Sequence, residues 1–198
     1  MSDASRPTDP VPSPLPPASA PAAAAARGVT RVLRRVRQTR DYLPTPVPEE
    51  ILTDILDVAR WTGSAGNRQP WTFITVTDPD VKRQMAEAAP YTAHIGIAPV
   101  VVAIALEPKA PEGDNFEEAR AAERIMIAAT AHGLACGIAR ARGEAQLVIG
   151  SLLGVPPGQV VRTMVSVGYP TAEALPFKTA PGTARKPLAE VVRREGFG

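Results

Sequence analysis

Residues 99–106 read P-V-V-V-A-I-A-L, and every side chain after the proline is apolar. A strand with one face in water alternates apolar and polar residues, whereas a strand covered on both faces is apolar throughout. The run therefore predicts a central strand of a sheet. Helical and strand-like segments alternate around it, and a long alanine-rich helix follows. The chain is thus expected to form a layered α+β or α/β domain.

The remaining elements follow from hydrophobic periodicity and from residues that begin or end helices. Gly133 is expected to cap the longest helix at its carboxyl end. Residues 169–198 show little periodicity except near 188–194. The expected helices cover 29–36, 49–60, 81–89, 115–132 and 144–153, and the expected strands cover 71–77, 99–106, 134–139 and 160–168.

Residues 1–27 differ from the rest, since they consist almost entirely of Pro, Ala, Ser, Thr and Asp. Such a segment has too little apolar surface to offset the entropy lost on ordering. It is expected to be a disordered Pro/Ala-rich tail, with the folded domain over residues 28–198. The chain has 198 residues and is 44% hydrophobic, which suits one globular domain.

Composition also argues against several partners and locations. The net charge of +2 is too small to indicate a nucleic-acid partner. The longest weakly polar run, 95–106, is too short to span a membrane, and seven prolines within residues 1–21 argue against a signal peptide. The single cysteine, Cys136, lies among apolar residues and is expected to be a buried, inert thiol. A cytoplasmic protein without a membrane partner is expected.

Common catalytic motifs are missing from the sequence. The chain has two histidines and one cysteine, without H-x-x-x-H or C-x-x-C spacing, so no metal site is expected. The chain has no G-x-S-x-G hydrolase motif, no G-x-G-x-x-G and no P-loop. His94 precedes the apolar strand and is expected to be a satisfied structural residue, although contact with a substrate is the alternative. His132 is expected to interact with the last carbonyls of its helix.

A polar turn joins the helix ending near Trp61 to the strand beginning at Trp71. Residues 64–71 read S-A-G-N-R-Q-P-W. Gly, Ser and Asn favour a turn that exposes backbone N–H groups, and Pro70 is expected to restrict Gln69 to an extended conformation. The stretch by itself fits either an ordinary loop or a cradle for a planar polar ligand.

A second motif, R-Q-T-R-D-Y-L-P-T-P-V-P over residues 37–48, precedes the helix 49–60. Together the two motifs resemble the FMN-dependent nitroreductase family, whose chains begin with an Arg/Ser-rich element, P-V-P-x-E, a helix and S-x-x-N-x-Q-P-W. The resemblance covers about residues 29–195 in the family's order. It extends to A-P-V-V-V-A-I-A-L (98–106), G-L-A-C-G-I-A-R-A (133–141), V-G-Y-P (167–170) and R-K-P-L-A-E-V-V (185–192).

The resemblance implies a three-layer α/β/α fold with a mainly antiparallel central sheet. It also implies a homodimer with FMN at the subunit interface and with the helix 115–132 as its main contact. The implied reaction is ping-pong hydride transfer from NAD(P)H through flavin N5 to a nitroaromatic, quinone or similar small electron acceptor. The alternatives are an NAD(P)H-independent or flavin-consuming reaction and, more remotely, a nucleic-acid-binding protein that uses the Arg-rich helix.

The resemblance also assigns cofactor contacts to residues of this chain. The N-terminal element would hold the phosphate, ribityl chain and pyrimidine, because arginine binds phosphate oxygens through two parallel hydrogen bonds. The polar turn would meet the cofactor across the dimer interface, and the backbone near residue 140 would face flavin N5. The cofactor-binding residues are expected to be Arg37, Gln38, Thr39, Arg40, Ser64, Ala65, Asn67, Gln69, Arg140, Ala141 and Arg185.

Overall fold

The computed structural model describes residues 20–109, 111–175 and 185–196, which divide into two units at Arg35 and Val36. The first unit contains helix α1 (Ala20–Arg35). This helix begins inside the segment assigned above to the tail, because the alanines at 22–26 favour helix strongly. Residues 1–19 lie outside the described part of the chain, so their disorder stays a prediction.

The second unit is built on a four-stranded sheet with strand order β1-β2-β4-β3. All three pairs of neighbouring strands are antiparallel. Every residue of β2 is buried, as the uninterrupted apolar run predicts. The strands are β1 (Trp71–Val76), β2 (Val100–Leu106), β3 (Ala135–Arg140) and β4 (Val160–Gly168).

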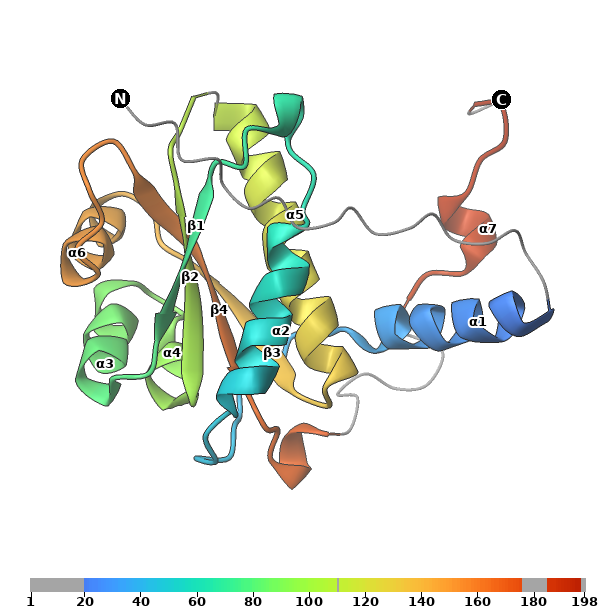
Figure 1. Cartoon of the computed structure of the whole chain (residues 1–198), viewed down its shortest axis with the longest axis horizontal. Helices are drawn as coiled ribbons and strands as arrows, with labels where there is room; N and C mark the ends of the chain where they lie inside the picture. Colours follow the sequence, from blue (N-terminus) through green and yellow to red (C-terminus); the bar gives the residue numbers. More distant parts are fainter. Residues whose placement is uncertain (1–19, 110, 176–184, 197–198) are drawn as a thin grey trace, which may run out of the picture. The chain divides into compact units, whose positions relative to one another are not determined.

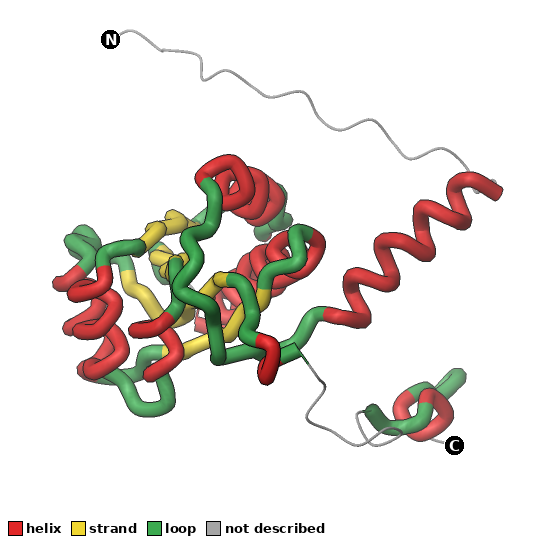
Figure 2. Tube along the Cα trace, turned by 90° about the horizontal axis from the view of Figure 1, so that it is seen from below, coloured by secondary structure: helices red, strands yellow, loops and turns green. Residues whose placement is uncertain are grey.

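Helices cover both faces of this sheet (Figure 1). Helices α2 (Glu49–Arg60) and α5 (Pro111–Ala131) lie on one face. Helices α3 (Pro79–Ala88), α4 (Ala93–Ile97) and α6 (Glu144–Leu152) lie on the other. Figure 2 shows the strands between these two groups of helices.

Strand β2 supplies side chains to both hydrophobic cores because successive residues of a strand point to opposite faces. One core holds Val100, Val102, Ile104 and Leu106, and the other holds Val101, Ala103 and Ala105. The structure therefore confirms the predicted α+β fold with three layers and an antiparallel central sheet.

Most expected elements are present, and the differences lie mainly at their ends. Helix α3 begins at Pro79 because the Asp78 carboxylate caps it, accepting hydrogen bonds from the N–H groups of Asp80 and Val81 at 2.9 and 3.0 Å. Helix α5 begins at Pro111, four residues earlier than expected, since proline suits a first helical turn. Helix α4 and the short helices η1 (Ala65–Asn67) and η2 (Ala172–Ala174) were not expected from the sequence, and α7 covers Leu188–Val191.

Two further expectations concern the chain as a whole. None of the helices in the described part of the chain is long and apolar enough to cross a membrane. Cys136 is 2% exposed, and burial raises the pKa of its thiol to about 12. This confirms a buried thiol that is protonated, and hence unreactive, near neutral pH.

Candidate functional site

The arginine-containing segment 37–42 lies against the outer edge of β3. Gln38 and Cys136 form a parallel bridge, and the Thr39 N–H donates to the Cys136 carbonyl at 2.7 Å. The Gln38 side chain adds a second bond, because its Oε1 accepts from the Ile138 N–H at 2.6 Å. The backbone that carries Arg37 and Arg40 is therefore fixed to the strand that ends at Arg140.

Tyr42 connects the same segment to strand β4. Its hydroxyl oxygen lies 2.6 Å from the Thr39 carbonyl and 2.7 Å from Ser166 Oγ. The Ser166 hydroxyl in turn donates to the Gly137 carbonyl at 3.0 Å. Burial is the main cause that raises the pKa of the Tyr42 hydroxyl, which therefore remains a hydrogen-bond donor at ordinary pH.

The cations of this region have different surroundings. The Arg37 guanidinium donates to the backbone carbonyl of Ala174 at 3.0 Å and also to that of Leu175, at the end of η2. Arg40 is exposed beside the bridge to β3. Arg140 is exposed at the end of β3, and its Nη2 lies 3.4 Å from Asn115 Oδ1 on α5. Arg185 is exposed in the C-terminal segment, after residues that the structure does not describe.

Ala141 has a different position from the one expected. Its side chain is buried, and its N–H donates to the Arg162 carbonyl at 2.8 Å. This amide therefore extends the pairing of β3 with β4. It is not presented to a ligand in this structure.

The polar turn 64–69 is largely closed on itself, which corrects the expectation of exposed backbone N–H groups. The N–H groups of Asn67 and Arg68 donate to the carbonyls of Ser64 and Ala65 at 3.0 and 3.3 Å. The Gln69 N–H donates to Ser64 Oγ at 2.8 Å. Gln69 Nε2 donates to Asn67 Oδ1 at 3.3 Å, which leaves the Asn67 amide nitrogen and the Gln69 amide oxygen to meet a ligand.

A residue outside the predicted site holds this turn. Glu117 of α5 is 3% exposed, and its Oε1 accepts from the Ala65 N–H at 2.6 Å. Its Oε2 accepts from Arg68 Nη2 at 3.3 Å. The available signal was two adjacent carboxylates, Glu117 and Glu118, inside the helix that the resemblance implies as the main dimer contact. Glu118 is fully buried as well and lies 3.5 Å from Arg162 Nε.

The two histidines differ from their expected roles. His94 is 4% exposed, and its Nε2 has no hydrogen-bond partner within the described residues, so the expectation of a satisfied histidine is wrong. Burial, and next the charge of Arg40, lower the pKa of its imidazole, which is therefore neutral at pH 7. His132 does not bind the last carbonyls of α5; its Nε2 lies 2.6 Å from Asp54 Oδ2 on α2.

Acidification should destabilise the protein through His94. Its pKa in the folded state is below the ordinary value of 6.5, so between those values the unfolded state binds more protons and stability falls as the pH falls. The measurement is urea unfolding at pH 7.5 and at pH 5.5. Between these two pH values we expect the free energy of unfolding to fall less in His94→Phe than in the wild type. The two falls should differ by at most about 1.4 kcal/mol per pH unit. Equal losses in the two proteins would contradict this role.

The sheet separates the predicted site residues of one chain into two groups. The turn 64–69 precedes Trp71, which pairs with Leu106, and Leu106 pairs with Val160. Segment 37–40 instead lies beside Cys136, which pairs with Val167. Val160 and Val167 are seven residues apart in β4, so the turn and the arginine segment lie roughly 20 Å apart along this strand. The arginine segment and the polar turn do not meet within one chain.

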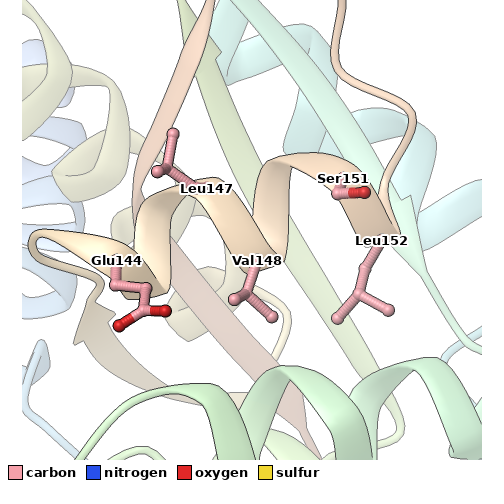
Figure 3. A pocket seen from close by; sticks show the side chains of 5 residues that line it. All are labelled: Glu144, Leu147, Val148, Ser151 and Leu152. Atoms are coloured by element: carbon pink, nitrogen blue, oxygen red, sulfur yellow. The ribbon is translucent and has the colours of Figure 1, made fainter.

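A shallow pocket elsewhere shares no residue with these groups. Its lining comes entirely from α6 and comprises Glu144, Leu147, Val148, Ser151 and Leu152 (Figure 3). Helix α6 covers the sheet face opposite α5. The pocket therefore adds nothing to the candidate site.

Comparison with known proteins places this fold and this residue pattern in a family. The sequence model of the Nitroreductase family matches residues 33–90 and 89–169. A Thermus thermophilus protein named NADH dehydrogenase is 31% identical to this chain over an alignment 198 positions long. The alignment covers 82% of this chain and 93% of that protein.

Solved structures show the same fold. An FMN-dependent nitroreductase from Clostridium difficile superposes with a TM-score of 0.72 at 23% identity, covering 84% of this chain and 98% of that one. A Desulfovibrio desulfuricans protein solved in complex with FMN gives a TM-score of 0.68 at 23% identity, with 86% and 98% of the two chains covered. The chain therefore belongs to the nitroreductase family of oxidoreductases.

Proposed function

We propose that the protein is an FMN-dependent oxidoreductase that transfers hydride from NAD(P)H to a nitroaromatic, quinone or similar small oxidant in a ping-pong reaction. Family membership supports the reaction class. The FMN bound to the Desulfovibrio desulfuricans relative and the name of the Thermus thermophilus relative support the cofactor and the reductant. FMN supplies the hydride-accepting N5 atom, so the chain itself needs no acid–base dyad.

The observation that carries the proposal is the fixed arginine segment on the edge of β3. Hydrogen bonds from Thr39 to Cys136 and from Ile138 to Gln38 hold its backbone. Arg37 and Arg40 on this segment have the charge and the planar donors that bind a phosphate or the oxygens of a flavin pyrimidine. The donor set therefore fits an anionic flavin nucleotide. Arg185 is proposed to join the phosphate from the C-terminal segment.

In this arrangement the Arg37 guanidinium has to bind backbone carbonyls of its own chain as well as the cofactor phosphate. It donates to the Ala174 and Leu175 carbonyls at the end of η2. A guanidinium has five N–H donors, so it can hold carbonyl oxygens and still offer donors to a phosphate. These carbonyls orient Arg37 before the cofactor binds, which lowers the entropy that binding costs.

The polar turn would offer neutral amide groups to the cofactor, and Arg140 would offer a positive charge. The Asn67 amide nitrogen and the Gln69 amide oxygen can donate to and accept from the pyrimidine edge or the ribityl hydroxyls. Arg140 adds positive charge near the end of β3, where a reduced, anionic flavin would be stabilised. Ser64 acts within the turn, since its hydroxyl accepts from the Gln69 N–H.

The separation of these groups favours a homodimer as the active form. The turn and the arginine segment lie roughly 20 Å apart along the sheet of one chain, which exceeds the combined reach of their side chains. A second copy that places its Asn67 and Gln69 opposite the first copy's Arg37 and Arg40 would complete the site.

The proposed compartment is the cytoplasm, since the one cysteine is a free, buried thiol.

The test is a visible absorption spectrum of the purified protein before and after reconstitution with FMN, followed by anaerobic addition of NADH or NADPH. We expect a flavin spectrum that bleaches with one of the two nucleotides. Bound flavin that neither nucleotide bleaches would favour an NAD(P)H-independent reaction. A protein that takes up no FMN would contradict the proposed cofactor and its binding residues.

A further inference from the structure

The polar turn is held by the amino-terminal half of α5. Glu117 Oε1 accepts from the Ala65 N–H at 2.6 Å, and Glu117 Oε2 accepts from Arg68 Nη2 at 3.3 Å. Arg120, one helical turn later, donates from Nη1 to the Gly63 carbonyl at 3.0 Å. The carboxylate of Glu117 is almost fully buried, with the residue 3% exposed. One helix therefore binds the turn at Gly63, Ala65 and Arg68.

The turn needs such support because its backbone is unusual. The φ angles of Gly66, Asn67 and Gln69 are 59°, 54° and 48°, so the expectation of an extended Gln69 before Pro70 is wrong. Glycine adopts this left-handed region readily and asparagine tolerates it, but it costs an ordinary residue such as Gln69 stability. Residues in this region persist only where surrounding contacts impose it. The Ser64 hydroxyl fixes the Gln69 N–H from inside the turn, and Glu117 fixes the Ala65 N–H from outside.

We infer that Glu117 is a positioning residue for the flavin: by binding the Ala65 N–H it holds the turn in the conformation that presents the Asn67 and Gln69 amides. This role rests on the proposed function. Glu117 itself does not touch the cofactor, since its oxygens are directed to Ala65 and Arg68. The neighbouring Glu118 cannot replace it, because its carboxylate lies 3.5 Å from Arg162 Nε on β4.

The two oxygens of Glu117 allow the role to be tested with a conservative variant. Glu117→Gln keeps an oxygen that can accept from the Ala65 N–H but removes the negative charge facing Arg68. Glu117→Ala removes both the accepting oxygen and the negative charge. If the backbone bond positions the turn, the glutamine variant should retain most FMN affinity and the alanine variant should lose it.

The experiment measures the dissociation constant of FMN for the full-length protein by flavin fluorescence, together with the kcat of the NAD(P)H reaction at saturating FMN. We expect Glu117→Ala to raise the dissociation constant roughly 10- to 100-fold. Glu117→Gln should remain within about fivefold of the wild type, and kcat of both variants at saturating FMN should change little. Glu87→Ala is the control, since it removes the same charge from an exposed site on α3.

Two results would overturn the role of Glu117. One is wild-type FMN affinity in Glu117→Ala, and the other is an equal loss of affinity in the glutamine and alanine variants. If Glu117→Ala does not fold, Glu117→Asp takes its place, because a side chain one carbon shorter withdraws the carboxylate from the Ala65 N–H. Unchanged affinity in Glu117→Asp would then overturn the role. Failure of the wild type to bind FMN would instead contradict the proposed function itself.

Discussion

Replacing Gly137 with alanine should lower the free energy of unfolding by about 1–3 kcal/mol and weaken FMN binding as well. A Cβ at this position would lie 2.7 Å from the Thr39 carbonyl oxygen and 3.0 Å from both His94 Cδ2 and Ser166 Oγ. The closest of these atoms belongs to backbone, so it cannot move away by a change of rotamer. The added methyl group therefore has to displace the segment that carries Arg37 and Arg40.

Urea unfolding of the apoprotein and titration with FMN measure the two effects of Gly137→Ala separately. Gly150→Ala is the matched control, because a Cβ there would have Val155 Cβ as its nearest neighbour at 4.0 Å. Gly150 lies inside α6, where alanine is expected to stabilise the helix by about 0.5–1 kcal/mol. A Gly137→Ala protein as stable as Gly150→Ala would show that the arginine segment is not packed against β3 in this way.

Tyr42→Phe should cost about 1–3 kcal/mol of stability, although only one oxygen atom is removed. The Tyr42 hydroxyl lies 2.6 Å from the Thr39 carbonyl and 2.7 Å from Ser166 Oγ, and Tyr42 is 8% exposed. Without that oxygen, a buried carbonyl loses its donor and water has little access to replace it. The loss is measured by urea unfolding of the apoprotein.

Tyr91→Phe provides the comparison for Tyr42→Phe. Tyr91 is 91% exposed, so water replaces whatever its hydroxyl binds, and we expect a change within about 0.5 kcal/mol. A double-mutant cycle with Ser166→Ala should show coupling between Tyr42 and Ser166. Additive effects of the two substitutions would contradict the contact between the Tyr42 and Ser166 hydroxyls.

The sequence predicted the layers of the fold well because they depend on local patterns. The uninterrupted apolar run at 100–106 became the fully buried strand β2, with helices on both sides. Apolar residues at helical spacing located α2, and Gly133, with a φ of 76°, ends the helical stretch after α5 as expected. Helix α4 was missed because five residues are too few to show a helical period.

The contacts of the site residues were much harder to anticipate. Gly, Ser and Asn at 63–67 predicted a turn, but no local pattern indicated that most of its N–H groups bond within the turn or to Glu117. His132 has a suitable helix terminus beside it, yet it pairs with Asp54, which is 78 residues away in the chain. Such partners come from distant segments, so no local pattern predicts them.

The family resemblance, the order of helices and strands and the residue types suited to an anionic flavin could all be read from the sequence, because they are properties of local composition and spacing. The folded chain was needed to show that segment 37–42 lies on the edge of β3, that Gly137 has to remain small and that a buried carboxylate on α5 holds the polar turn. The fold also separates the turn from the arginine segment. These contacts could not be anticipated because hydrogen bonding and close packing act between residues near in space, and strand pairing sets which residues those are.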